Sequence, residues 1–128
     1  MLENTEAFSG FAVADPAAAK KFYGGTLGLK VTDMDEQNGL MQLELAGGRN
    51  VLVYPKPDHS PGNYTILNFQ VDEIDEVVRG LTERGVQFER YEDFDQDENG
   101  ISRGEGPLIA WFKDPSGNIL SVLQMDDG

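Results

Sequence analysis

The sequence predicts an α+β protein built from two βαβββ modules, whose curved mixed sheets form a cup. Two observations support this fold class. The same order of strand and helix patterns occurs twice, once over residues 6–55 and once over residues 64–124. The segment between them, residues 55–63, contains three prolines and no apolar periodicity, which is typical of a linker. We therefore expect residues 1–128 to form a single domain of two homologous modules.

The first module opens with an apolar strand pattern, followed by a clear helix start. Asp15 is expected to cap this helix and Pro16 to occupy its first turn. Gly28 is expected to end it in a left-handed conformation. The predicted strands of this module are 8–13, 30–34, 40–46 and 50–54, and turns at Asn-Gly and Gly-Gly separate the last three.

The second module repeats this order. Asp72 is expected to cap a helix that ends at Gly85, and this helix has the same length as the one between Asp15 and Gly28. Its apolar residues follow helical spacing and are Ile74, Val77, Val78 and Leu81. The predicted strands are 64–71, 86–91, 108–113 and 119–124.

Composition excludes several classes of function. The chain has 10 Lys plus Arg against 23 Asp plus Glu, and its formal net charge is −13. Such a field repels phosphate backbones and anionic lipids, so we expect neither a nucleic acid nor a membrane partner. There is no cysteine, which excludes disulfides and thiolate metal sites. The acidic N-terminus has no signal-peptide pattern, so the expected location is cytoplasmic.

Three motifs resemble those of one known family. They are the Asp-Pro, Phe-Tyr and Leu-Gly pairs within residues 15–29, the run Val71 to Asp75, and Asp114-Pro115-Ser116-Gly117-Asn118. In this order they resemble the glyoxalase/bleomycin resistance protein/dioxygenase superfamily, also called the vicinal oxygen chelate (VOC) superfamily. The resemblance covers about residues 6–124 and implies paired modules that usually form a homodimer. Many such enzymes chelate a divalent metal in the cup, whereas other members bind drugs without metal chemistry.

The residues at the implied metal-ligand positions cannot bind a divalent metal well. By resemblance, the ligands are a His on the first strand of each module and a Glu on the last strand. This chain has Phe8, Ile66 and Ser121 there, and its one histidine, His59, lies in the linker. We therefore expect no metal and no cofactor. Whether the protein is an enzyme stays open, but a metal-dependent glyoxalase or dioxygenase is not expected.

A second possible metal motif is also weak. Residues 95–100 match the start of an EF-hand loop, but the twelfth position is Gly106, and Glu105 comes one residue early. The segment is therefore interpreted as a solvated turn.

Strand alternation predicts a candidate ligand-binding site of aromatic and neutral polar side chains. Its members are Trp111, Tyr54, Phe8, Asn68, Gln70 and Ser121. The alternative is that these residues fill a closed cup as core or interface. Tyr91, Phe94 and Arg103 lie in or beside the long loop 92–107, which is either a lid or a solvated loop.

The favoured function is metal-independent binding of a small aromatic or cationic, antibiotic-like molecule by a cytoplasmic homodimer. The alternative is a glyoxalase-like enzyme of the lyase or dioxygenase type with an atypical site. A scaffold without a ligand is the third possibility.

Overall fold

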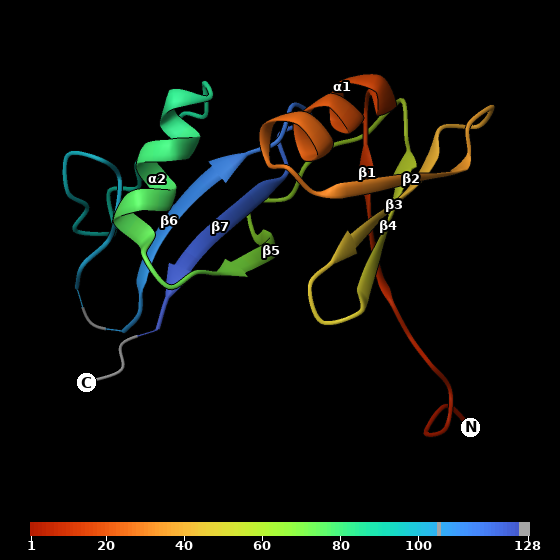
Figure 1. Cartoon of the computed structure of the whole chain (residues 1–128), viewed down its shortest axis with the longest axis horizontal. Coiled ribbons are helices and arrows are strands. Elements are labelled where there is room, and N and C mark those ends of the chain that lie inside the picture. The colour runs from red at the N-terminus through yellow and green to blue at the C-terminus, as the bar shows by residue number, and fades with distance from the viewer. Residues whose placement is uncertain (105, 126–128) are drawn as a thin grey trace. The chain divides into compact units, whose positions relative to one another are not determined.

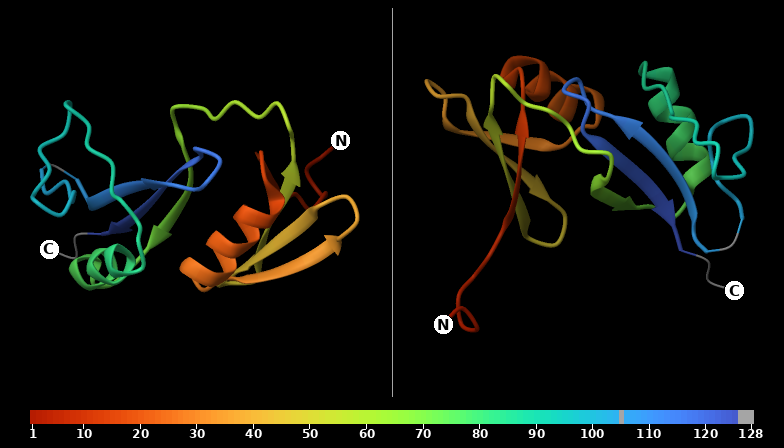
Figure 2. Two further views of the ribbon diagram at one scale, coloured as in Figure 1. Left: turned by 90° about the horizontal axis from the view of Figure 1, so that it is seen from above. Right: turned by 180° about the vertical axis from the view of Figure 1, so that it is seen from behind.

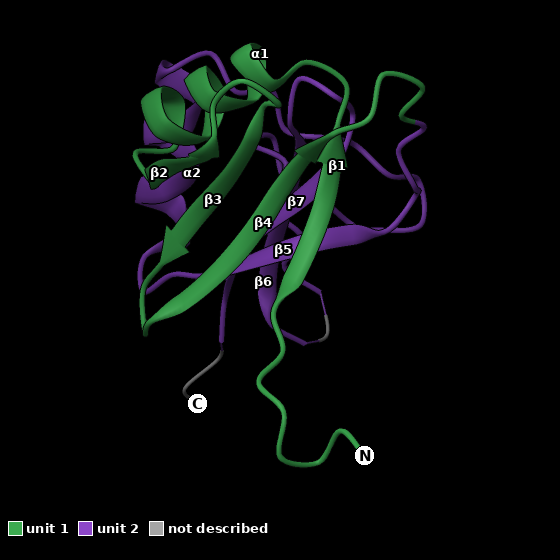
Figure 3. Ribbon diagram, turned by 90° about the vertical axis from the view of Figure 1, so that its right-hand side faces the viewer, with its two compact units in different colours: residues 1–59 green, residues 60–128 purple. Residues whose placement is uncertain are grey.

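The computed structural model describes residues 1–104 and 106–125. The chain divides into two compact units, residues 1–59 and residues 60–128 (Figure 3). Each unit has a mixed β-sheet with helix on one face, which confirms the α+β class. Within the described ranges, no helix is long and apolar enough to cross a membrane.

Unit 1 contains a four-stranded sheet in the order β1-β4-β3-β2 (Figure 1). β1 runs parallel to β4, and the other pairs are antiparallel. The elements are β1 (Ser9–Val13), α1 (Pro16–Lys20), a π-helical turn η1 (Lys21–Thr26), β2 (Lys30–Asp35), β3 (Leu40–Leu45) and β4 (Arg49–Pro55).

The start of α1 agrees with the sequence prediction. The Asp15 Oδ1 atom accepts hydrogen bonds from the backbone N–H groups of Ala17 (3.0 Å) and Ala18 (3.2 Å). Pro16 occupies the first turn, where its missing N–H costs nothing. Because both capping signals are local in sequence, the sequence predicts this helix start well.

The second half of this helix differs from the prediction. From Lys21 to Thr26 the helix widens into a π-helix, in which the Leu27 N–H donates to the Phe22 carbonyl at 2.9 Å. Gly24 and Gly25 lie within this turn. Glycine is a weak helix former, so it lets the backbone leave α geometry at little cost.

The two faces of the unit 1 sheet differ in character. One face packs against α1 and η1, and its buried side chains are Phe11, Val13, Met41, Leu43, Val51 and Val53. The other face carries Gly10, Gln42 and Leu52, which are aligned across β1, β3 and β4. Tyr54 also lies on this second face, because it is two residues from Leu52.

Unit 2 contains a three-stranded sheet in the order β5-β7-β6, with one helix (Figure 2). β5 runs parallel to β7, and β6 runs antiparallel to it. The elements are β5 (Thr65–Gln70), α2 (Ile74–Glu83), β6 (Leu108–Lys113) and β7 (Ile119–Gln124).

The predicted strand 86–91 was wrong. Its backbone contacts with β6 are an isolated bridge, between Phe88 and Phe112, and a hydrogen bond from the Glu89 N–H to the Trp111 carbonyl at 2.7 Å. The Gln96 side chain binds the backbone here, because it donates to the Glu89 carbonyl and accepts from the Tyr91 N–H. A side chain therefore takes the place of a neighbouring strand.

The predicted cap of α2 was also wrong. Glu73, not Asp72, occupies the capping position, and its side chain makes no capping bond. Instead, the Ile74 N–H donates to Gln124 Oε1 on β7 at 2.9 Å. At the other end, Gly85 has φ +95° and ends the helix as expected.

Candidate functional site

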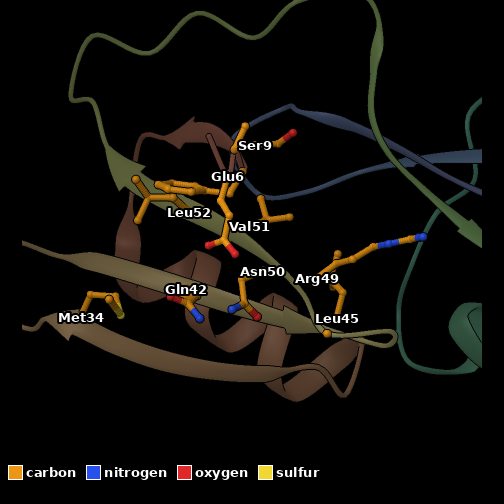
Figure 4. A pocket seen from close by; sticks show the side chains of 12 residues that line it. Glu6, Ser9, Met34, Gln42, Leu45, Arg49, Asn50, Val51 and Leu52 are labelled. Atoms are coloured by element: carbon orange, nitrogen blue, oxygen red, sulfur yellow. The ribbon is translucent and has the colours of Figure 1, made fainter. Parts of the chain in front are cut away.

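A pocket of about 880 Å³ opens in unit 1 beside the sheet face that points away from α1 (Figure 4). The N-terminal segment and strands β2, β3 and β4 all contribute to it. Met34 lies toward one end of the pocket, and Leu45 and Arg49 lie toward the other. This volume falls within the range of drug-sized ligand sites.

Phe8 contributes an exposed aromatic ring to this pocket, with 73% of its surface accessible. The other predicted residue of this unit, Tyr54, is 40% exposed and lies on the same sheet face. Tyr54 is not among the described pocket-lining residues. The structure thus brings one of these two predicted residues into the pocket.

The carboxylate of Glu44, next to the pocket, already has partners within the protein. Glu44 Oε2 accepts a hydrogen bond from Thr32 Oγ1 at 2.6 Å and lies 3.5 Å from Lys30 Nζ. The bond from Thr32, and then the charge of Lys30, lower the pKa of the Glu44 carboxyl. Glu44 is therefore held as a carboxylate with partners of its own.

The other four predicted residues lie on one face of the unit 2 sheet. Asn68, Ser121 and Trp111 are direct cross-strand neighbours on β5, β7 and β6. Gln70 lies on the same face, two residues after Asn68. Phe112 and Leu120 lie on the opposite face and are fully buried. Strand alternation in the sequence was sufficient to predict this sorting.

Ser121 is fully buried, and its hydroxyl donates to Asn68 Oδ1 at 2.6 Å. This bond fixes the Asn68 amide, whose nitrogen remains the end that can donate to a ligand. Asn68 itself is exposed. The buried Ser121 hydroxyl thus holds the exposed Asn68 side chain in one orientation.

Trp111 belongs to an aromatic cluster that the sequence did not predict as such. Its ring centroid lies 4.7 Å from that of Phe94 and 5.4 Å from that of Tyr91. The Tyr91 hydroxyl is buried and has no hydrogen-bond partner among the described residues. Burial, and then the charge of Glu89, raise the pKa of Tyr91. The loop therefore packs its aromatic rings onto Trp111.

The remainder of this loop is folded around two polar side chains. Gln96 Nε2 donates to the carbonyls of Glu89 (2.9 Å) and Gly100 (2.8 Å). Asp97 Oδ1 accepts from the N–H groups of Asn99 and Ile101, both at 2.9 Å. The loop 92–107 is therefore held by hydrogen bonds between its own residues, and not by contacts with solvent alone.

Arg103 links this loop to α2. Its Nε atom donates to Asp97 Oδ2 at 2.8 Å, and its NH2 group contacts Asp75 Oδ1. Burial acts to raise the pKa of Asp97, but the bonds from Arg103 and the backbone outweigh it and lower this pKa. Asp97 thus already has internal partners, which argues against a calcium loop. Glu105 lies outside the described residues.

The implied metal site does not fit the residues present. Phe8 and Ile66 offer no donor atom, and the Ser121 hydroxyl is committed to Asn68. Across residues 1–104 and 106–125, no three His, Cys, Asp or Glu side chains are grouped closely enough to hold a metal ion. We therefore derive no metal chemistry for this site.

The Asp-Pro-Ser-Gly-Asn motif builds the turn between β6 and β7. Asp114 Oδ1 accepts from the N–H groups of Ser116 (2.8 Å) and Asn118 (2.9 Å), and Oδ2 accepts from Asn118 Nδ2 (2.9 Å). Gly117 has φ +86°, and a Cβ there would lie 2.9 Å from Pro61 Cγ. This motif therefore has a structural role.

Residues 7–122 match the Glyoxalase/Bleomycin resistance protein/Dioxygenase superfamily, and the chain belongs to this family. This confirms the resemblance that the motifs indicated. No curated protein matches the chain significantly.

Solved structures share this fold. An antibiotic binding protein, TnmS3, from Streptomyces sp. CB03234 is 24% identical, with a TM-score of 0.71, and the match covers 96% of this chain and 98% of that one. A superfamily member from Sphaerobacter thermophilus is also 24% identical, with a TM-score of 0.67 and coverage of 93% and 97%. The fosfomycin resistance protein FosX from Listeria monocytogenes is 13% identical, with a TM-score of 0.72 and coverage of 97% and 93%. At these identities, the likeness concerns the fold alone.

Proposed function

We propose that this protein binds a small aromatic or cationic molecule without using a metal ion, as an antibiotic-sequestering protein does. The observation that carries the proposal is the unit 1 pocket, which has the volume of a drug site and an exposed aromatic ring, Phe8, among its lining residues. Phe8 is also where the family resemblance implies a metal ligand. A position used elsewhere for coordination here offers a stacking surface.

The face of the unit 2 sheet that carries Asn68, Gln70 and Trp111 is the second surface that we assign to binding. Asn68 and Gln70 are exposed there and offer amide groups, and Trp111 offers a half-exposed indole. A few neutral polar groups beside aromatic surface suit an organic ligand better than an ion. The antibiotic-binding activity of TnmS3 is compatible with this proposal.

A thermal-shift screen against planar aromatic antibiotics, run with and without EDTA, tests the proposal. A ligand at 100 times its Kd should raise stability by about 2.7 kcal/mol by mass action. We expect the shift to be unchanged by EDTA. Ligands that act only after addition of a divalent metal would contradict the proposal.

The variant Phe8→Ala supplies the residue-level test. It should weaken binding of a hit several-fold without lowering the melting temperature, because the side chain is largely exposed. Tyr64→Ala is the matched control, since Tyr64 is a similarly exposed aromatic residue in unit 2, at 66%. Equal loss of binding in both variants would show that Phe8 has no specific role.

A further inference from the structure

The charges of the unit 1 pocket are few and of both signs. Of the described residues that line it, only Glu6 and Arg49 are charged. Both are exposed, and Glu6 lies two residues before Phe8 on the N-terminal segment. Glu6 and Phe8 both line the pocket from this segment, so the carboxylate and the ring are offered to the same cavity.

Neither charge is neutralised by another residue of the described ranges. The side chains of Glu6 and Arg49 form no ion pair or hydrogen bond with any other described residue. Two lysines of the same unit behave differently, because Lys30 on β2 pairs with Glu44 and Lys20 on α1 pairs with Asp33. The pocket therefore retains one carboxylate and one guanidinium that are free to meet a ligand.

The uncharged lining of the pocket suits a flat organic body. Leu52, Met34 and the Phe8 ring supply apolar surface, while Gln42 and Asn50 supply amides. Arg49 lies beside Leu45 at the end of the pocket opposite Met34 (Figure 4). A ligand that satisfies both charges must carry a cation and an anion on one body.

We propose that this pocket selects a planar zwitterion, whose cationic group pairs with Glu6 over the Phe8 ring and whose anionic group pairs with Arg49. This inference rests on the proposed function and narrows its ligand class. The aromatic face of Phe8 adds a cation–π contact to the ion pair. Arg49 provides a planar fork of donors that fits a carboxylate.

Three dyes with one xanthene body test the charge preference directly. Rhodamine B is a zwitterion at neutral pH, its ethyl ester is a cation, and fluorescein is an anion. Fluorescence anisotropy titrations should place rhodamine B first, the ester second and fluorescein last. Conversion of the acid to the ester should weaken binding about threefold, the size expected for a solvent-accessible ion pair.

Charge-neutral variants assign the effect to the two residues. Glu6→Gln should weaken both rhodamines by about threefold and leave fluorescein no weaker. Arg49→Gln should abolish the difference between rhodamine B and its ester. Glu76→Gln and Arg79→Gln on α2, both exposed in unit 2, change net charge equally and should have no effect.

The outcomes separate this inference from the proposed function. If rhodamine B binds no better than its ester, or if Arg49→Gln leaves their ratio unchanged, the zwitterion preference is overturned while small-molecule binding stands. Absence of binding by all three dyes, when the antibiotic screen yields metal-independent ligands, also overturns it. Equal effects of Glu6→Gln and Glu76→Gln would overturn it in favour of the general field of the protein.

Discussion

The indole of Trp111 is proposed as a stacking surface for a ligand, and it also packs against aromatic rings of its own loop. Alternation with Phe112 was enough to predict which face of the sheet Trp111 occupies, because the period of a strand is fixed. The contacts of Trp111 with Tyr91 and Phe94 could not be predicted in the same way. They depend on how a long loop returns to the sheet.

Truncation of this side chain tests its packing role. Trp111→Ala should lower the free energy of unfolding by about 2–3 kcal/mol, less than for a fully buried aromatic residue. Urea denaturation followed by circular dichroism measures this loss. Phe94→Ala is the control, because it removes an exposed member of the same cluster and should cost less. A Trp111→Ala variant of unchanged stability would show that the cluster contributes nothing to folding.

At the scale of elements, the sequence predicted those features that depend on near neighbours. The hydrogen bonds that cap α1 lie within three residues of Asp15, and the sequence predicts this cap correctly. The predicted cap at Asp72 was wrong because the first N–H of α2 donates to the side chain of Gln124, a residue far along the chain. The prediction of a strand at 86–91 was wrong for a different reason, since the side chain of Gln96, only a few residues away, binds the backbone of that segment, and strand patterns carry no signal for such a contact.

The turn between β6 and β7 allows a direct test of a structural motif. Asp114→Ala removes the acceptor of three hydrogen bonds, two from backbone N–H groups and one from Asn118 Nδ2. Because the site is buried, we expect a loss of about 2–3 kcal/mol in unfolding free energy. Chemical denaturation measures it. Loss of ligand binding at unchanged stability would contradict the structural role.

The loop around Asp97 should depend on pH. Its pKa in the folded protein is lowered, so the ionised carboxylate stabilises the fold at neutral pH. This contribution is present above the pKa of an unfolded Asp and is lost as the pH falls through the folded value. Asp97→Asn should therefore lower the melting temperature at pH 7, and the difference from wild type should shrink at about pH 3.

Hydrogen exchange localises this effect. In Asp97→Asn, the amides of Asn99 and Ile101 should exchange faster at neutral pH. The side chain that accepts their hydrogen bonds loses its negative charge and its ion pair with Arg103. Amides of β7 serve as the internal control. Uniform acceleration across both segments would indicate global destabilisation instead of local opening of the loop.

For the whole molecule, the sequence predicts the fold class and the protein family correctly, but it does not identify the ligand. The repeat of helix and strand patterns has a physical basis, because each unit builds its own sheet and buries one face. The pocket in unit 1 was only partly predicted. Phe8 was named, whereas Glu6, Arg49 and Met34 lie on segments whose approach to one another depends on the folded sheet.

The prediction that the protein holds no metal ion is open to direct measurement. Purified, dialysed protein should contain far less than one transition-metal ion per chain by plasma mass spectrometry. EDTA should leave its melting temperature unchanged, since no resident ion would stabilise the fold. One zinc, nickel, iron or manganese per chain, retained through dialysis, would refute this.

The last prediction concerns association, which the open sheet edges favour. β2 is an edge strand that carries Lys30, Asp33 and Asp35, and such charges discourage pairing with another chain. β1 and β5 are also edges of their own sheets, but they contain no charged residue. We therefore expect a homodimer that uses an uncharged edge.

Sedimentation velocity should show a species of twice the 14.1 kDa chain mass at micromolar concentration, little altered by salt. A monomer at every concentration would contradict the prediction, and a dimer that dissociates in salt would assign association to charged surfaces instead.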